Sequence, residues 1–284
     1  MALLRVIERD RRDVLGEGPL WSARDDAVYW TDILGHRINR LSLAGGAVES
    51  WRMPGYTGWV IERESGGFVA GIGREVAVLD PDGTIIDRIA RIEPDRAGNR
   101  VNDAKADAAG RVWMGTMPIT ADKPTGGFYR LDPEGAVTLV DHGYSIANGP
   151  AIGADGQTIL HTDSGLGIIY RFQLDAAGNP GERTEFIRFE PHWGKPDGMT
   201  FDAEGGLWVA CWGGGCVMRF TPEGERDRII ELPASQISSC TFAGPNLDRM
   251  FVTSAAVDVD EPLGGALFEV DPGCRGLPTH RYRG

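Results

Sequence analysis

The chain has 284 residues, of which 42% are hydrophobic, so it is long enough to bury a sizeable core. Its formal net charge is −12, and a surface this acidic repels both phosphate backbones and anionic lipids. Composition and charge therefore argue against nucleic-acid and membrane partners. A soluble enzyme is the simpler interpretation.

The first residues of the chain carry neither a long apolar run nor a small-residue cleavage site, so they do not predict a signal peptide. Nowhere does the sequence approach the roughly 18 apolar residues of a membrane-spanning helix. The four cysteines form no CxxC pair, which favours free thiols in a reducing compartment. We therefore expect a soluble, cytoplasmic protein.

Short runs rich in β-branched and aromatic residues recur along the chain, and such runs favour strands. In chain order they span residues 27–32, 67–71, 111–116, 158–163, 205–212 and 249–254. A second strand-like segment follows each run, at residues 37–41, 75–81, 127–133, 169–172, 217–222 and 266–272. Four of these six segments end in Asp-Pro or Thr-Pro, which stops a strand. A third segment then leads outward, as at residues 228–232.

Each repeat also opens with a short segment before its aromatic strand. The openings begin near Glu17, Trp59, Asn102, Asn148, Asp197 and Ser239, which stand 42 to 49 residues apart. A period in this range with four strands per unit is typical of a β-propeller blade. The sequence thus predicts an all-β fold, a six-bladed β-propeller with four antiparallel strands per blade, as a single domain over residues 1–284.

A ring of blades closes when one terminus of the chain completes the last sheet. Two segments are candidates for that outermost position in blade six, namely the N-terminal residues 3–8 and the C-terminal residues 279–283. The sequence does not choose between them.

Polar residues at the blade openings suggest a metal site, because the first strand of each propeller blade lines the central channel. Two carboxylates, Glu17 and Asp197, and two carboxamides, Asn102 and Asn148, share that repeat position. Facing carboxylates repel one another, and a hard divalent cation with oxygen ligands relieves the repulsion. Taken singly, Asn-Gly and Asp-Gly are ordinary turn dipeptides. Their shared register favours the metal interpretation.

Five motifs carry a family resemblance. They are Leu-Gly-Glu-Gly-Pro-Leu-Trp at 15–21, Asn-Arg-Val-Asn-Asp at 99–103, Gly-Arg-Val-Trp-Met-Gly-Thr-Met at 110–117, Ala-Asn-Gly-Pro at 147–150 and Lys-Pro-Asp-Gly-Met-Thr at 195–200. With them the chain resembles the senescence marker protein/gluconolactonase/luciferin-regenerating-enzyme family, which includes regucalcin and bacterial sugar lactonases. The resemblance spans nearly the whole chain, and the joint occurrence of the motifs is specific.

The resemblance implies one divalent metal ion bound by Glu17, Asn148 and Asp197, with Asp197 also as the catalytic general base. Ca²⁺ is the first expectation, with Mn²⁺, Mg²⁺, Zn²⁺ or Fe²⁺ as alternatives. It further implies that Arg100 and Asn102 contact the substrate beside the metal. Residues 117–126 offer no clear match to the family's substrate-selecting loop, so the resemblance does not identify the sugar.

The function we expect is metal-dependent hydrolysis of a sugar (aldono) lactone to the aldonic acid, which makes the chain a hydrolase acting on carboxylic ester bonds. One alternative keeps the site and changes the ester, for instance to an organophosphate or a homoserine-type lactone. The other is a calcium-binding regulatory protein. Arg100 argues against the latter, because a cation site gains nothing from a nearby guanidinium. We expect a monomer or weak homo-oligomer whose partner is the small-molecule lactone.

Overall fold

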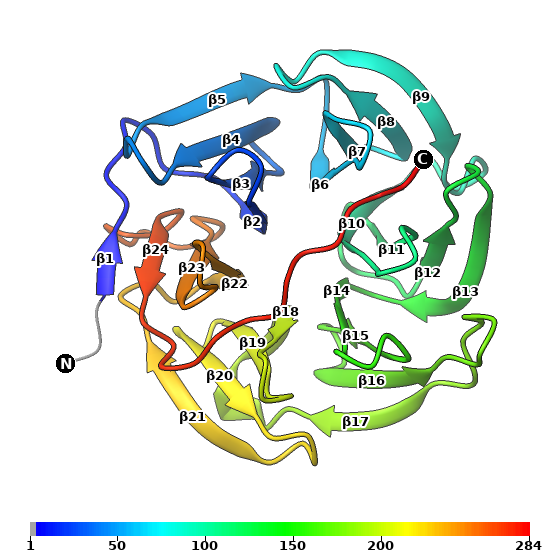
Figure 1. Cartoon of the computed structure of the whole chain (residues 1–284). Coiled ribbons are helices and arrows are strands. Elements are labelled where there is room, and N and C mark those ends of the chain that lie inside the picture. The colour runs from blue at the N-terminus through cyan, green and yellow to red at the C-terminus, as the bar shows by residue number, and fades with distance from the viewer. Residues whose placement is uncertain (1–3) are drawn as a thin grey trace.

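The computed structural model describes residues 4–284 and folds them into six four-stranded antiparallel sheets set around a central channel. Figure 1 looks along that channel and shows the six sheets as blades, each with its first strand innermost. The predicted six-bladed β-propeller is confirmed. One 3₁₀ turn, η1 (Pro191–Trp193), is the only helical segment among the described residues.

Each blade contributes four strands, ordered from the channel outward. Blade one holds β2 (Gly16–Ser22), β3 (Ala27–Asp32), β4 (Arg37–Ser42) and β5 (Val48–Arg52). Blade two holds β6 (Thr57–Glu62), β7 (Phe68–Ile72), β8 (Glu75–Leu79) and β9 (Ile85–Arg91). Blade three holds β10 (Asn99–Ala106), β11 (Val112–Pro118), β12 (Gly126–Leu131) and β13 (Val137–Tyr144).

The remaining blades follow the same order. Blade four holds β14 (Ala147–Ile152), β15 (Thr158–Asp163), β16 (Ile168–Gln173) and β17 (Thr184–Arg188). Blade five holds β18 (Lys195–Phe201), β19 (Leu207–Trp212), β20 (Cys216–Phe220) and β21 (Arg226–Glu231). Blade six holds β22 (Ile237–Ala243), β23 (Arg249–Ser254), β24 (Leu267–Val270) and, outermost, β1 (Leu4–Val6).

A buried tryptophan recurs in the second strand of blades one, three and five, and explains the aromatic repeat in the sequence. Each indole nitrogen donates to an aspartate, over 2.8 Å from Trp30 to Asp13, 2.8 Å from Trp113 to Asp107 and 2.9 Å from Trp208 to Asp202. An arginine pairs with each aspartate in turn. These networks let a large ring pack in the core while its polar N–H group is satisfied.

The N-terminal strand closes the ring. β1 pairs antiparallel with β24, with Leu4 opposite Val270 and Val6 opposite Phe268. Of the predicted segment 3–8, Leu3 lies outside the described residues. The C-terminal segment instead runs across one end of the channel, as the red trace in Figure 1 shows. It ends beside blade two, where the Tyr282 N–H group donates to the Glu62 carbonyl over 2.9 Å.

Each of the six channel-lining strands carries a register shift against its neighbour. In β2 the shift lies between Glu17 and Leu20, and in β14 it lies between Asn148 and Ala151. The corresponding shifts are present in β6, β10, β18 and β22. A β-bulge of this kind inserts an extra residue and re-aims the side chains around it, which decides what points into the channel.

No helix between residues 4 and 284 is long and apolar enough to cross a membrane.

Candidate functional site

A pocket of about 260 Å³ lies at one end of the channel, and all five predicted site residues line it. They are Glu17, Arg100, Asn102, Asn148 and Asp197, and each is at most 6% exposed. They come from the inner strands of blades one, three, four and five, and the ring brings these distant segments together. Glu17 and Asn148 stand just before the bulge of their strands, whereas Asn102 and Asp197 stand within it.

A chain of hydrogen bonds fixes the amide side chains. Arg100 Nη1 donates to Asn102 Oδ1 over 2.5 Å, and Asn102 Nδ2 donates to Asn148 Oδ1, also over 2.5 Å. Asn148 Nδ2 then donates to Ser164 Oγ over 2.9 Å, and that hydroxyl donates to the Pro196 carbonyl over 2.6 Å. The Asn148 amide oxygen accepts one hydrogen bond and has a second lone pair available for a cation.

Negative charge is concentrated in the pocket. Burial, followed by the charges of Asp197 and Asp103, holds the pKa of Glu17 well above its usual range. Burial and the charge of Asp103 raise the pKa of Asp197 in the same direction. Arg100 opposes both shifts, and burial lowers its own pKa to about 10, so its guanidinium stays protonated at neutral pH. The three buried carboxyl groups, Glu17, Asp103 and Asp197, therefore outnumber the one buried cation near them, Arg100.

The residues present fit a hard divalent cation. Asp197 Oδ1 is buried and accepts no hydrogen bond from any described residue, so one charged oxygen has no partner to offset its lost hydration. Every candidate ligand offers oxygen, which suits Ca²⁺, Mg²⁺ or Mn²⁺. Only two of the three ligands are carboxylates, and residues 4–284 hold no cluster of three His, Cys, Asp or Glu side chains arranged around a metal. The site thus depends on the amide of Asn148.

The mouth of the pocket is largely apolar, which sequence reasoning did not predict. Leu34 and Ile119 are 39% and 44% exposed there. The loop after β11 contributes Ile119 and Ala121, and Lys195 adds a second cation. Tyr56, Met117, Ile146, Trp212 and Val257 complete this rim. Leu34, Ile119 and Val257 lie in connecting loops outside the sequence motifs, so the motifs gave no signal for them.

Blades two and six do not supply ligands to the pocket. Trp59 and Ser239, which open those repeats in the sequence, are buried, but neither lines the pocket. In blade two Gly58 comes so close to blade three that an added Cβ would lie 2.3 Å from the Asn102 carbonyl oxygen. This close approach leaves no room for a side chain at Gly58 beside Asn102. Four of the six repeat positions, in blades one, three, four and five, place polar groups in the pocket.

Fold and site together define a six-bladed propeller with an oxygen-rich pocket at the mouth of its channel. The family model described as the SMP-30/Gluconolactonase/LRE-like region matches residues 15–256. The chain belongs to this family, as its motifs predicted.

Relatives within the family carry different names. The chain is 35% identical to a pentonolactonase of Haloferax volcanii, with 99% of this chain and 98% of the relative covered. It is 34% identical to a 6-deoxy-6-sulfogluconolactonase of Pseudomonas putida, with 92% and 93% covered. It is 33% identical to a regucalcin of Gallus gallus, with 95% of each covered.

Two solved structures share the fold closely. A luciferin-regenerating enzyme superposes with a TM-score of 0.93 at 28% identity, over 100% of both chains. A regucalcin of Agrobacterium tumefaciens, described as a calcium-binding protein, gives a TM-score of 0.93 at 29% identity, over 99% of this chain and 98% of the other.

Proposed function

We propose that this chain hydrolyses a sugar lactone with the help of one divalent cation. The observation that carries the proposal is the convergence of two buried carboxylates, two amides and a guanidinium on one pocket. The lactonase activities in the names of two relatives support a hydrolase of carboxylic esters. A site that only binds a cation would not explain why the positively charged Arg100 is buried beside the metal ligands.

Glu17, Asn148 and Asp197 would hold the cation through oxygen ligands, which suit hard divalent cations, and among these Ca²⁺ is our first choice. The calcium-binding description of the Agrobacterium neighbour supports that choice. When bound, the cation would supply Lewis-acid chemistry to an ester carbonyl in the pocket.

Arg100 is the substrate-binding cation in this proposal. Its Nη1 is held by Asn102 Oδ1 and, over 3.1 Å, by the Val101 carbonyl. Its other nitrogens donate to no acceptor within residues 4–284, so they are available to a lactone carbonyl or hydroxyl. A guanidinium locked in this way loses little freedom when the substrate binds, which favours affinity.

Asp197 is the residue that would handle the attacking water. Its Oδ1 has no hydrogen-bond partner among the described side chains and faces the same pocket. A carboxylate that also binds a cation is a weak base, so the main contribution of Asp197 would be to orient the attacking water molecule toward the ester carbonyl.

The proposal is tested with metal-stripped protein and a panel of glucono-, xylono-, arabino- and galactonolactones in a pH-stat. We expect acid release that a chelator abolishes and added Ca²⁺ or Mn²⁺ restores. Asp197→Ala with saturating metal should lose at least 100-fold in kcat, about the usual contribution of a positioned acid–base group. Full activity of that variant would remove Asp197 from the mechanism.

The apolar mouth favours a second candidate, an ester with an apolar substituent such as an acyl-homoserine lactone or an organophosphate. Leu34, Ile119 and Trp212 offer such a group a surface that a polyhydroxylated sugar does not use. Turnover of paraoxon or acyl-homoserine lactone without turnover of any aldonolactone would favour this candidate. Metal binding without turnover of any ester would instead favour a calcium-binding regulatory protein.

A further inference from the structure

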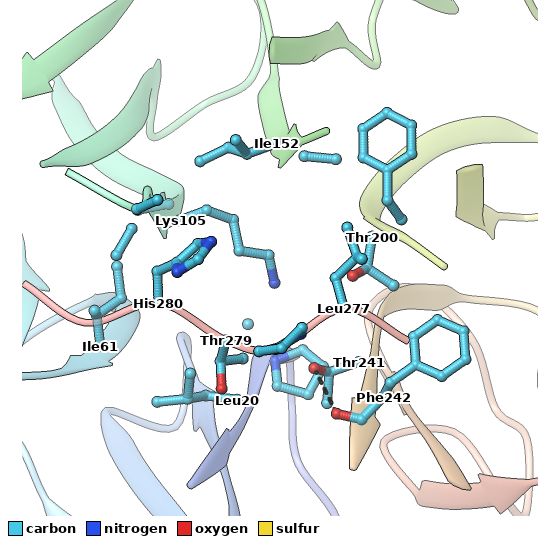
Figure 2. A pocket seen from close by; sticks show the side chains of 18 of the residues that line it. Leu20, Ile61, Lys105, Ile152, Thr200, Thr241, Phe242, Leu277, Thr279 and His280 are labelled. Carbon is cyan, nitrogen blue, oxygen red and sulfur yellow. Dashed lines mark hydrogen bonds between the residues drawn. The ribbon is translucent and has the colours of Figure 1, made fainter. Parts of the chain in front are cut away.

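A second cavity, of about 250 Å³, lies at the other end of the channel. The same inner strands line it below the candidate site, through Leu20 of β2, Lys105 of β10, Ile152 of β14 and Thr200 of β18. The C-terminal segment crosses it and contributes residues 277–280. Figure 2 shows this segment passing beside the side chains that face the cavity.

Lys105 is a cation without a partner in this cavity. Figure 2 shows its side chain extending toward the centre of the cavity. Within residues 4–284 it forms no hydrogen bond and no salt bridge, although its charge lowers the pKa of Asp103 on the same strand. No aspartate or glutamate lines the cavity. In a chain of net charge −12, a cavity whose one formal charge is positive selects for an anion.

The other residues that line the cavity indicate which chemical groups the anion should carry besides its charge. Leu20, Ile61, Ile152, Phe242 and Leu277 form apolar walls. The polar groups beside Lys105 are the hydroxyls of Thr200, Thr241 and Thr279 and the imidazole of His280. The Thr241 and Thr279 hydroxyls already donate to the Phe242 and Trp21 carbonyls, over 3.4 and 2.9 Å. One cation and apolar walls suit a monoanion better than a phosphate ester, whose second charge would have no partner.

The cavity has a size and an entrance that suit a small ligand. About 250 Å³ is less than the roughly 300–1,000 Å³ typical of sites for drug-sized molecules. Ala108, Ala154 and His280 line it and are exposed, so it reaches solvent beside the C-terminal segment.

We propose that this cavity is a second binding site, for a small monocarboxylate with an apolar body. The carboxylate would pair with the Lys105 ammonium, and the hydrocarbon part would lie against Leu20, Ile61 and Phe242. The site is separate from the candidate active site, and it stands whether or not the chain is a lactonase.

The test is binding of butyrate, followed by calorimetry and by saturation-transfer NMR on the full chain. Butyramide has the same shape without the charge, and gluconate has the charge without the apolar body. We expect butyrate to bind with a dissociation constant in the millimolar range or tighter, and both comparison ligands to bind at least tenfold more weakly.

Four lysine variants locate the butyrate site, and circular dichroism checks that each is folded. Lys105→Met should weaken binding at least tenfold, and Lys105→Arg should retain most of it. Lys123→Met removes the same charge from an exposed loop and should change nothing. Lys195→Met removes the cation at the mouth of the other pocket and should also leave binding unchanged.

Three outcomes would overturn the proposal. The first is equal binding of butyrate and butyramide, or no binding of butyrate at all. The second is unchanged binding in the Lys105→Met variant. The third is loss of binding in Lys195→Met but not in Lys105→Met, which would place the carboxylate in the candidate active site.

Discussion

The buried carboxylates of the candidate site destabilise the chain when no cation is bound. Burial raises the pKa of Asp103 to about 6, and the pKa values of Glu17 and Asp197 are raised as well. A carboxyl group whose pKa is higher in the folded state than in the unfolded state favours folding at low pH. This contribution is lost as the pH rises through the folded-state value. At neutral pH the metal-free protein is therefore less stable than it would be without these buried carboxyl groups, but the site is already arranged to bind a cation.

Asp103→Asn should stabilise the metal-free protein at pH 8. The variant removes a buried charge and keeps an oxygen for the Ala104 N–H group, which lies 2.8 Å away. With a folded-state pKa of about 6 against 3.8 for a free aspartate side chain, and about 1.4 kcal/mol per pH unit, we expect a gain of about 1–3 kcal/mol. The gain should shrink toward zero at about pH 3, below the unfolded-state pKa, where the carboxyl is largely protonated in both states. Urea unfolding in a chelator at the two pH values measures it.

The matched control for this prediction is Asp260→Asn, which removes an exposed carboxylate and should change stability by less than about 0.5 kcal/mol. A variant at Asp103 that is less stable than the wild type at pH 8 would contradict the electrostatic account.

Arg100→Ala should raise KM far more than it weakens metal binding. Arg100 is not one of the proposed metal ligands, so its loss should affect the substrate more than the metal. We expect a KM about tenfold to hundredfold higher, because the substrate loses a charged hydrogen bond. Isothermal titration with Ca²⁺ should give a dissociation constant within about threefold of the wild type. An equal loss in both measurements would mean that Arg100 shapes the metal site rather than the substrate site.

At the scale of single elements, the sequence predicted the strands but gave no indication of the β-bulges in them. The predicted runs at 27–32, 158–163 and 249–254 coincide with β3, β15 and β23. These strands are buried on both faces, so their composition is distinctive. A bulge depends instead on how one strand packs against the next. The close approach of Gly58 in blade two to Asn102 in blade three was therefore not predictable.

The C-terminal segment is held in place chiefly by Tyr282. Its ring is 1% exposed within the core between blades two and three, and its backbone bonds to Glu62 and Glu64. Tyr282→Ala should therefore destabilise the protein by about 3–5 kcal/mol, as other large-to-small aromatic changes in cores do. Guanidinium unfolding measures the loss.

Tyr282→Phe is the control, because its ring still fills the core. The hydroxyl only donates weakly to the Asp132 and Pro133 carbonyls, over 3.3 and 3.4 Å, so we expect a cost of about 1 kcal/mol. Similar small losses in both variants would show that the segment lies on the ring without stabilising it.

At the scale of the whole molecule, the repeat explains why distant residues converge. A period of 42 to 49 residues predicts six blades, and equivalent positions of a closed ring face one channel. The sequence therefore predicted Glu17, Asn148 and Asp197 in one pocket, and the structure brings them there. It did not predict the apolar mouth or the second cavity. Loops form the first, and the second arises where a non-repeating terminal segment crosses the channel.

The most direct test of the central claim is a crystal structure grown with Mn²⁺, with anomalous diffraction recorded on both sides of the manganese edge. The account predicts one strong anomalous peak at the mouth of the channel, within about 2.5 Å of oxygens from Glu17, Asn148 and Asp197. A pocket without a peak at saturating Mn²⁺, or a peak bound only by other residues, would contradict it.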